Sequence, residues 1–109
     1  MLQTPTRLHH AQLLAAALLL AGGAAFGQSA QSLQIRSLAA TCANCHGTEG
    51  KALPGDAMVS LAGLPKDYIV AQMQAFREGK RPATIMHQLS KGYSSQQIDA
   101  LAAYFASKQ

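Results

Sequence analysis

The sequence predicts an all-α fold with three main helices, and three observations support this class. Apolar residues recur three and four positions apart in three stretches, which is the spacing of one helical face. Glycine and proline residues separate these stretches and break regular structure between them. No alternating strand pattern precedes the two cysteines of the chain.

The first helix is expected from about Ser32 to Cys45. Gly47 follows at a position where glycine commonly ends a helix. The apolar face of this helix repeats at i, i+3, i+4 and i+7, a helical pattern, formed by Ile35, Leu38, Ala39 and Cys42.

The end of this helix carries the string Cys42-Ala43-Asn44-Cys45-His46, a Cys-x-x-Cys-His box. This box is the attachment motif of c-type haem. Residues three and four apart share one helix face, so Cys42 and Cys45 can form thioethers with the two vinyl groups of one porphyrin. His46 lies on the same face and can ligate the iron from the proximal side. The box therefore predicts one covalently bound haem c.

A Cys-x-x-Cys box has two other interpretations. A redox-active Cys-x-x-Cys usually accompanies a βαβ pattern, which is absent here. A structural zinc site needs four ligands, and after the predicted leader only His87 remains outside the box as a further cysteine or histidine. Haem attachment explains the box better than either alternative.

The chain between the box and the second helix, residues 48–63, is expected to be a loop. A structureless connection of this length is typical of a functional or ligand-wrapping segment. The second helix is expected over Lys66–Glu78, with Pro65 at its first turn and Gly79 after its end. Its inner face is predicted to hold Tyr68, Ile69, Gln72, Met73 and Phe76.

A second loop is expected from Lys80 to Tyr93, before the last helix. Ser94 as N-cap and Gln97 three residues later form a capping box, which marks the start of that helix. Its buried stripe repeats at helical spacing and contains Ile98, Leu101, Ala102 and Phe105.

The sixth iron ligand decides between electron transfer and ligand binding, because a methionine thioether suits electron transfer and an open site favours ligand binding. Met73 lies on the apolar face of a helix, where a core role is expected. Met58 follows the box by only twelve residues, whereas Met86 lies in a loop that can cross to the opposite haem face. Met86 is therefore the predicted ligand. Its neighbour His87 is the rival, with a loop or surface role as the simpler interpretation.

The N-terminus is interpreted as a secretory signal peptide, residues 1–27. A polar start with Arg7 precedes the apolar core Leu13–Ala21, and small residues lead to a cleavage site after Gly27, with Ala25 as second choice. A retained anchor is the alternative, but Leu13–Phe26 is shorter than the roughly 20 residues that span a bilayer. Residues 28–109 are then one small, periplasmic domain whose marginal core depends on haem.

The whole chain carries a formal net charge of +4, too mild for a nucleic-acid-binding protein. Its clearest basic cluster is Arg77, Lys80 and Arg81. Cations are favoured at a helix C-terminus, so a solvated helix end explains this cluster. A docking patch or a site that neutralises the haem propionates is the alternative.

The order of these features resembles a class I cytochrome c along the whole predicted mature chain. The resemblance implies a small fold of three main helices wrapped around a covalent haem, with His46 and Met86 as axial ligands. It also implies that the first and last helices cross, which would bring Leu38 and Ala39 near Leu101, Tyr104 and Phe105.

Three strings, residues 45–50, 60–64 and 85–94, are similar to bacterial mono-haem and di-haem cytochromes, particularly the cytochrome subunit of flavocytochrome c sulfide dehydrogenase. The resemblance implies a periplasmic electron carrier that catalyses no bond chemistry itself. Its partners would be redox proteins, such as a terminal oxidase or reductase. The alternatives are a haem subunit that accepts electrons from a flavoprotein sulfide dehydrogenase, and a ligand-binding haem sensor.

Overall fold

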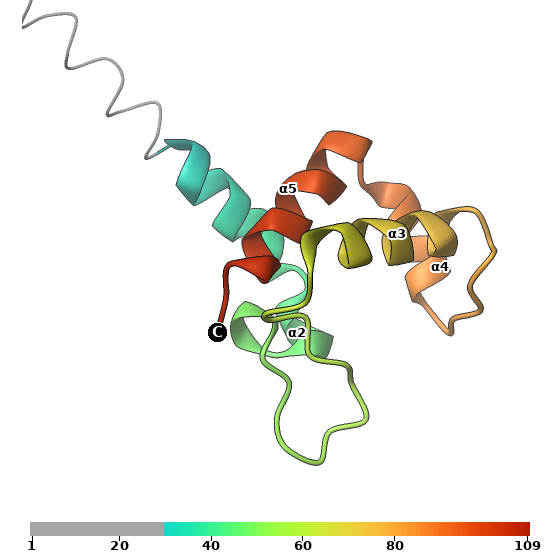
Figure 1. Ribbon diagram of the computed structural model, residues 1–109, viewed down its shortest axis with the longest axis horizontal. Coiled ribbons are helices and arrows are strands. Elements are labelled where there is room, and N and C mark those ends of the chain that lie inside the picture. The colour runs from blue at the N-terminus through green and yellow to red at the C-terminus, as the bar shows by residue number, and fades with distance from the viewer. Residues whose placement is uncertain (1–29) are drawn as a thin grey trace, which may run out of the picture. The chain divides into compact units, whose positions relative to one another are not determined.

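The computed structural model describes residues 30–109, so the predicted signal peptide and its boundary at residue 28 lie outside the described part (Figure 1). The chain divides into two units, the second of which spans Ile35–Gln109 and is described below. Residues 30–40 are helical. The further elements are α2 (Ala43–His46), η1 (Thr48–Gly50), α3 (Lys66–Arg77), α4 (Met86–Leu89), η2 (Ser90–Gly92) and α5 (Ser95–Ala106). No strand occurs in residues 30–109, and the predicted all-α class is confirmed.

The first predicted helix is interrupted directly before the haem box. The Thr41 hydroxyl donates to the Leu38 carbonyl at 2.7 Å, and the Cys42 N–H donates to the Ala39 carbonyl at 3.1 Å. These bonds reach back three residues rather than four, which tightens the backbone and competes with the α-helical pattern. The prediction of one continuous helix to Cys45 is therefore wrong, and the box begins a new turn, α2.

The last helix forms as predicted. The Ser94 hydroxyl accepts from the Gln97 N–H at 3.1 Å, and the Gln97 side-chain oxygen accepts from the Ser94 N–H at 2.8 Å. This reciprocal pair is a complete capping box. The predicted stripe is buried along α5 and consists of Ile98, Leu101, Ala102 and Phe105.

The core joins α3, α5 and the helical residues before the box. Ala39 lies in one buried cluster with Ile69 of α3 and with Leu101, Ala102 and Phe105 of α5, and Leu38 and Tyr104 pack against that cluster. The predicted contact between the first and last helices is confirmed. An exposed ion pair between Lys66 and Asp99, 2.8 Å long, also links α3 to α5.

The inner face of α3 differs in part from the prediction. Ile69 is buried and Met73 packs against the core, as expected, but Tyr68 is exposed and Val70 takes a core position instead. The helix ends at Arg77, one residue earlier than predicted. Tyr68 lies in the first turn of α3, directly before the buried Ile69.

The second loop contains structure that the sequence does not reveal. Met86–Leu89 form α4 and Ser90–Gly92 form η2, so the prediction of an irregular segment from Lys80 to Tyr93 is wrong over these residues. Each is a single turn, too short to show helical periodicity. In Figure 1 both lie at the end of the orange loop that follows α3, and α4 packs against α3.

Among residues 30–109, no helix is both long enough and apolar enough to cross a bilayer.

Candidate functional site

The Cys-x-x-Cys-His box occupies α2 and the residue before it. The His46 N–H donates to the Cys42 carbonyl at 3.0 Å, so one helical turn joins the first and last residues of the box. Both thiols are free; Cys42 is partly buried and Cys45 is exposed. One turn therefore presents two uncommitted thiols and an imidazole, which is the donor set required for covalent haem attachment.

Burial raises the pKa of the Cys42 thiol above its usual range, and this effect outweighs the opposing effect of the Thr41 hydroxyl, 3.9 Å from the sulfur. A raised pKa keeps the Cys42 thiol largely protonated at neutral pH.

The imidazole of His46 is oriented by the loop that follows the box. Its Nδ1 lies 2.7 Å from the carbonyl oxygen of Val59. A carbonyl can only accept, so Nδ1 carries the proton and Nε2 is the free nitrogen. A ligating histidine typically donates its other ring N–H to a carbonyl or carboxylate in this way.

Gly50 anchors that loop to the rest of the fold. Its carbonyl accepts the N–H of Leu61 at 2.8 Å, the N–H of Ala62 at 3.1 Å and the hydroxyl of Ser60 at 2.8 Å. Gly50 has φ +79°, and a Cβ there would lie 2.7 Å from the ring of Phe105. Only glycine fits this close approach between the loop and α5.

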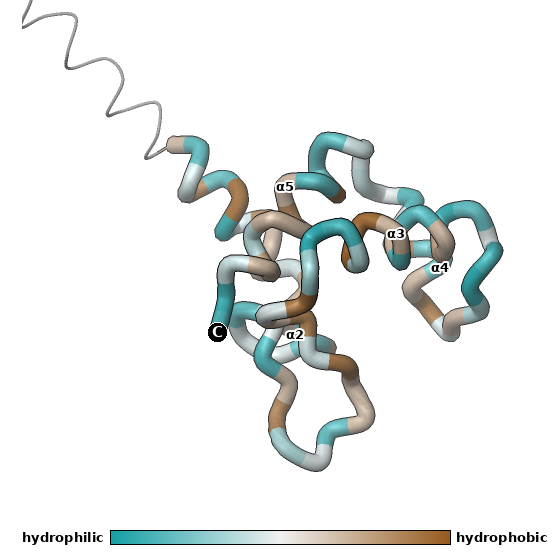
Figure 2. Tube along the Cα trace, viewed as in Figure 1, coloured by the Kyte–Doolittle hydropathy of each residue, from teal (hydrophilic) through white to brown (hydrophobic). Residues whose placement is uncertain are grey.

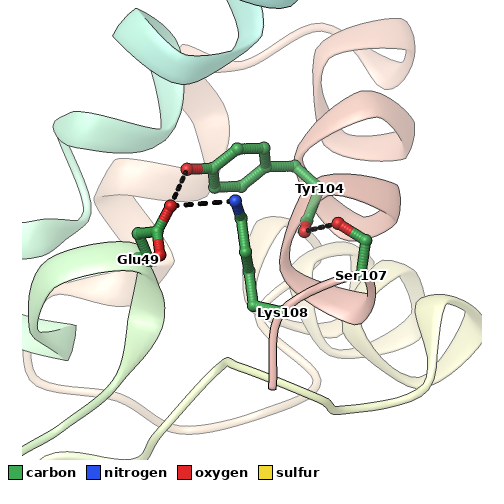
Figure 3. A network of polar contacts seen from close by, with 4 residues as sticks. All are labelled: Glu49, Tyr104, Ser107 and Lys108. Atoms are coloured by element: carbon green, nitrogen blue, oxygen red, sulfur yellow. Dashed lines mark hydrogen bonds and ion pairs between the residues drawn. The ribbon is translucent and has the colours of Figure 1, made fainter.

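A polar network ties the turn after the box to the end of α5 (Figure 3). The Lys108 ammonium donates to Glu49 Oε1 at 2.9 Å, and the Tyr104 hydroxyl reaches the same oxygen at 3.5 Å. The ammonium also lies 4.3 Å from the centre of the Tyr104 ring. Glu49 has φ +55°, the only positive φ of a residue other than glycine in the described chain. The network holds this unfavourable conformation.

The predicted ligand Met86 is partly buried at the start of α4. Ile85 and Leu89, one turn apart beside it, are exposed. His87 has a different environment: its Nδ1 is buried without a hydrogen-bond partner among the described residues. Ser90, three residues after His87, is completely buried. His87 therefore lies towards the protein side of α4.

The other two methionines, Met73 and Met58, differ in how far they are buried. Met73 packs against the core, as predicted. Met58 is 45% exposed in the loop that carries Val59, which is the loop bonded to His46.

Large hydrophobic side chains are exposed on the two segments that flank the box and Met86. Figure 2 shows hydrophobic residues along the loop that projects beyond α2. Apolar side chains exposed beside a cofactor-attachment motif are suited to contact an apolar ligand such as a porphyrin. The exposed residues on these segments are Leu53, Met58 and Val59 in the loop and Ile85 and Leu89 at α4.

The basic cluster after α3 is bonded within the chain. Arg77 donates to the Tyr93 carbonyl and to the Ser95 hydroxyl, and Arg81 donates to Gln72 and lies 4.7 Å from the centre of the Phe76 ring. Lys80 forms an exposed ion pair with Glu78 at 2.6 Å. These contacts support a helix-end role rather than a free docking patch.

Sequence reasoning missed Val59, Gly50, and the Glu49–Tyr104–Lys108 network. Val59 acts through its carbonyl, which every residue has, so its side chain gives no signal. Gly50 lies within residues 48–63, which the sequence predicts only as a loop, although its positive φ and its closeness to Phe105 make glycine a specific requirement there.

Comparison with known proteins places the chain in a family. Residues 35–109 match the family model "Cytochrome c", and the chain belongs to the cytochrome c family. Members of this family carry covalently bound haem c and transfer electrons, and residues 35–109 form one such domain.

The similar proteins include larger ones. The chain is 38% identical to a thiosulfate dehydrogenase electron acceptor of Thiomonas intermedia, covering 62% of this chain and 31% of that protein. It is 35% identical to the cytochrome subunit of sulfide dehydrogenase of Chlorobaculum tepidum, covering 62% and 60%. A solved structure of cytochrome c4 from Acidithiobacillus ferrooxidans matches with a TM-score of 0.57 and 35% identity, covering 61% and 37%. The match thus spans less than two thirds of each relative.

Proposed function

We propose that this chain is a periplasmic electron carrier in which Cys42 and Cys45 hold one haem c and His46 and Met86 are its axial ligands. The observation that supports this most strongly is the bond between His46 Nδ1 and the Val59 carbonyl. That bond fixes the ring orientation and leaves Nε2 free for iron. The bonded haem supplies reversible one-electron chemistry.

The position of α4 favours Met86 over His87 as the distal ligand. At 100° per residue, Met86 falls between the exposed Leu89 and the buried Ser90, whereas His87 lies about 160° around the helix from both exposed residues, Ile85 and Leu89. The Nδ1 atom of His87 is buried without a hydrogen-bond partner among the described residues, so this nitrogen is not available to iron in the position that His87 occupies. Met58 belongs to the loop bonded to His46, which supports a place on the proximal side.

The proposed ligands and their surroundings suit a haem that gains and loses electrons while no bond is made or broken. A thioether opposite an imidazole favours a high potential. Ligands that are retained in both oxidation states keep the structural change on reduction small. The exposed apolar side chains on both flanking segments would exclude water from a bound haem, which would raise the potential further.

Absorption spectra of two variants test the ligand assignment. Ferric wild-type protein and His87→Ala should show the weak far-red band of methionine-to-iron charge transfer, and Met86→Ala should lack it. Loss of the band in His87→Ala with retention in Met86→Ala would contradict the assignment. Rapid CO binding by the ferrous wild-type protein would favour the ligand-binding alternative instead.

Export is proposed from the N-terminal segment. Mass spectrometry of the protein purified from the periplasm should find a chain that begins at Gln28 and carries one haem. A chain that retains residues 1–27 in the membrane fraction would favour the anchored alternative.

A second candidate function is electron acceptor, or haem subunit, of a dehydrogenase that oxidises an inorganic sulfur compound. The relatives named for thiosulfate dehydrogenase and sulfide dehydrogenase favour it. The test mixes ferric protein with a purified dehydrogenase of either kind and its substrate, and follows haem reduction by stopped flow. The rate should saturate with dehydrogenase and exceed the rate with substrate alone. An equal rate in the two mixtures would exclude that dehydrogenase as donor.

A further inference from the structure

The Val59 carbonyl that orients His46 has its own support. Val59 precedes three consecutive residues whose donor groups all reach one acceptor, the carbonyl of Gly50: the Ser60 hydroxyl at 2.8 Å, the Leu61 N–H at 2.8 Å and the Ala62 N–H at 3.1 Å. Residues 59–62 are thus bonded to His46 at one end and to Gly50 along the rest. We call Gly50 and residues 59–62 the proximal clamp.

The clamp is rigid at its Gly50 side. The Gly50 N–H donates to the Gly47 carbonyl at 2.9 Å, and the Gly63 N–H donates to the Phe105 carbonyl at 3.0 Å. Gly50 is buried, against the Phe105 ring. The Gly50 carbonyl therefore cannot move along with residues 59–62. The Ser60 hydroxyl and the Leu61 and Ala62 N–H groups thus hold this segment in one position.

Ser60 is the only side chain among the clamp's donors. Its hydroxyl bond is adjacent to the Val59 carbonyl, so it restrains the peptide that accepts from His46. We propose that Ser60 is a positioning residue for the proximal ligand, which acts through the Val59 carbonyl on the His46 imidazole. This inference rests on the proposed role of His46 as an axial ligand.

The consequence is electronic as well as structural. A well-aligned bond from Nδ1 to a carbonyl makes the imidazole a stronger electron donor to iron, as second-shell partners do in other metal sites. A stronger donor stabilises the ferric state and lowers the reduction potential. Loosening the Val59 carbonyl should therefore raise the potential, while the ligands themselves remain unchanged.

The test uses the holoprotein with three substitutions. Ser60→Ala removes the hydroxyl and Ser60→Thr keeps it. Ser107→Ala is the matched control, because Ser107 also donates its hydroxyl to a backbone carbonyl, that of Tyr104 at 2.7 Å, and is not among the donors to Gly50. The readouts are the midpoint potential and the exchange rate of the His46 ring N–H, measured by NMR.

Ser60→Ala should shift the potential upward and speed the ring N–H exchange by about 2- to 10-fold, the range expected for one lost hydrogen bond. Ser60→Thr should restore both values towards the wild type, and Ser107→Ala should change neither. Unchanged potential and exchange in Ser60→Ala would overturn the inference, as would a change only in the free energy of unfolding.

A wild-type measurement covers the case in which Ser60→Ala yields no holoprotein. If the clamp opens as a unit, the Leu61 and Ala62 amides and the His46 ring N–H should share one opening equilibrium in hydrogen exchange. Opening of the ring N–H that is independent of these amides would overturn the inference. A wild-type ferric spectrum without the far-red band would instead contradict the proposed Met86 ligand, and unchanged axial ligation in His46→Ala would contradict the proposed role of His46.

Discussion

The proximal and distal ligand segments are built differently. On the proximal side, His46 is bonded to Val59, and residues 60–62 converge on Gly50, which packs against α5. On the distal side, α4 has local bonds: the Gln88 and Leu89 N–H groups donate to the Ile85 carbonyl at 2.9 and 3.1 Å. Packing on α3 holds this single turn. The proposed proximal ligand His46 is thus held by a segment bonded to the core, and the proposed distal ligand Met86 by a single turn with only local hydrogen bonds.

Loss of covalent haem attachment should destabilise both the segment around His46 and the segment around Met86. It is the change with the largest expected effect. A Cys42→Ala/Cys45→Ala double variant removes the covalent bonds to the haem, and a chain this small has a marginal core without it. We expect no covalent haem on a denaturing gel and a strong loss of helical circular dichroism. A haem-free product that is fully helical and melts cooperatively would contradict the dependence of the fold on haem.

Gly50→Ala tests the rigidity of the proximal side. Alanine at position 50 would have to adopt a left-handed backbone conformation, and its Cβ would lie 2.7 Å from the Phe105 ring. We therefore expect a loss of about 2–5 kcal/mol in unfolding free energy. Gly55→Ala is the matched control. Gly55 also has positive φ, but no atom lies within 4 Å of its Cβ position, and a loss of about 1–2 kcal/mol is expected. Equal losses in denaturant titrations would contradict the importance of the contact with α5.

Met86→Ala addresses the distal side alone. Loss of the thioether should lower the reduction potential, within the roughly 0.8 V range that axial ligands span. The fold should remain, because the proximal clamp does not involve α4. Potentiometric titration and circular dichroism measure the two quantities. Met58→Ala is the control, and a larger drop in potential for Met58→Ala than for Met86→Ala would reverse the assignment.

Glu49→Gln has the smallest expected effect and depends on pH. The Lys108 hydrogen bond and charge hold the pKa of Glu49 below its usual range. A carboxylate whose pKa is lowered by folding stabilises the protein above its unfolded pKa, and this contribution is lost as the pH falls through the folded value. Wild type should therefore exceed Glu49→Gln in melting temperature at pH 7, and the difference should shrink in acid.

Glu78→Gln is the control for that measurement, because Glu78 pairs with Lys80 two residues away and joins no distant segments. It should change the melting temperature less than Glu49→Gln at pH 7. A Glu49→Gln difference that is the same at pH 7 and in acid would contradict the network in Figure 3 as an electrostatic tie.

The features predicted from the sequence are those encoded in side-chain type at regular spacing. The Ser94–Gln97 capping box, the α5 stripe and the Cys-x-x-Cys-His box are of this kind. The break at Thr41 and the single turn of α4 depend on local hydrogen bonds that leave no periodic pattern. The partner of His46 is a backbone carbonyl brought close by the fold, so residue types alone do not identify it.

Iron K-edge X-ray absorption of the wild-type holoprotein tests the proposed coordination most directly, because it counts sulfur and nitrogen neighbours of the iron in each oxidation state. With Met86 and His46 as ligands, one sulfur and five nitrogens should surround the iron in both ferric and ferrous protein, with little change in distance. Six nitrogens in either state, or a five-coordinate ferrous iron, would contradict it.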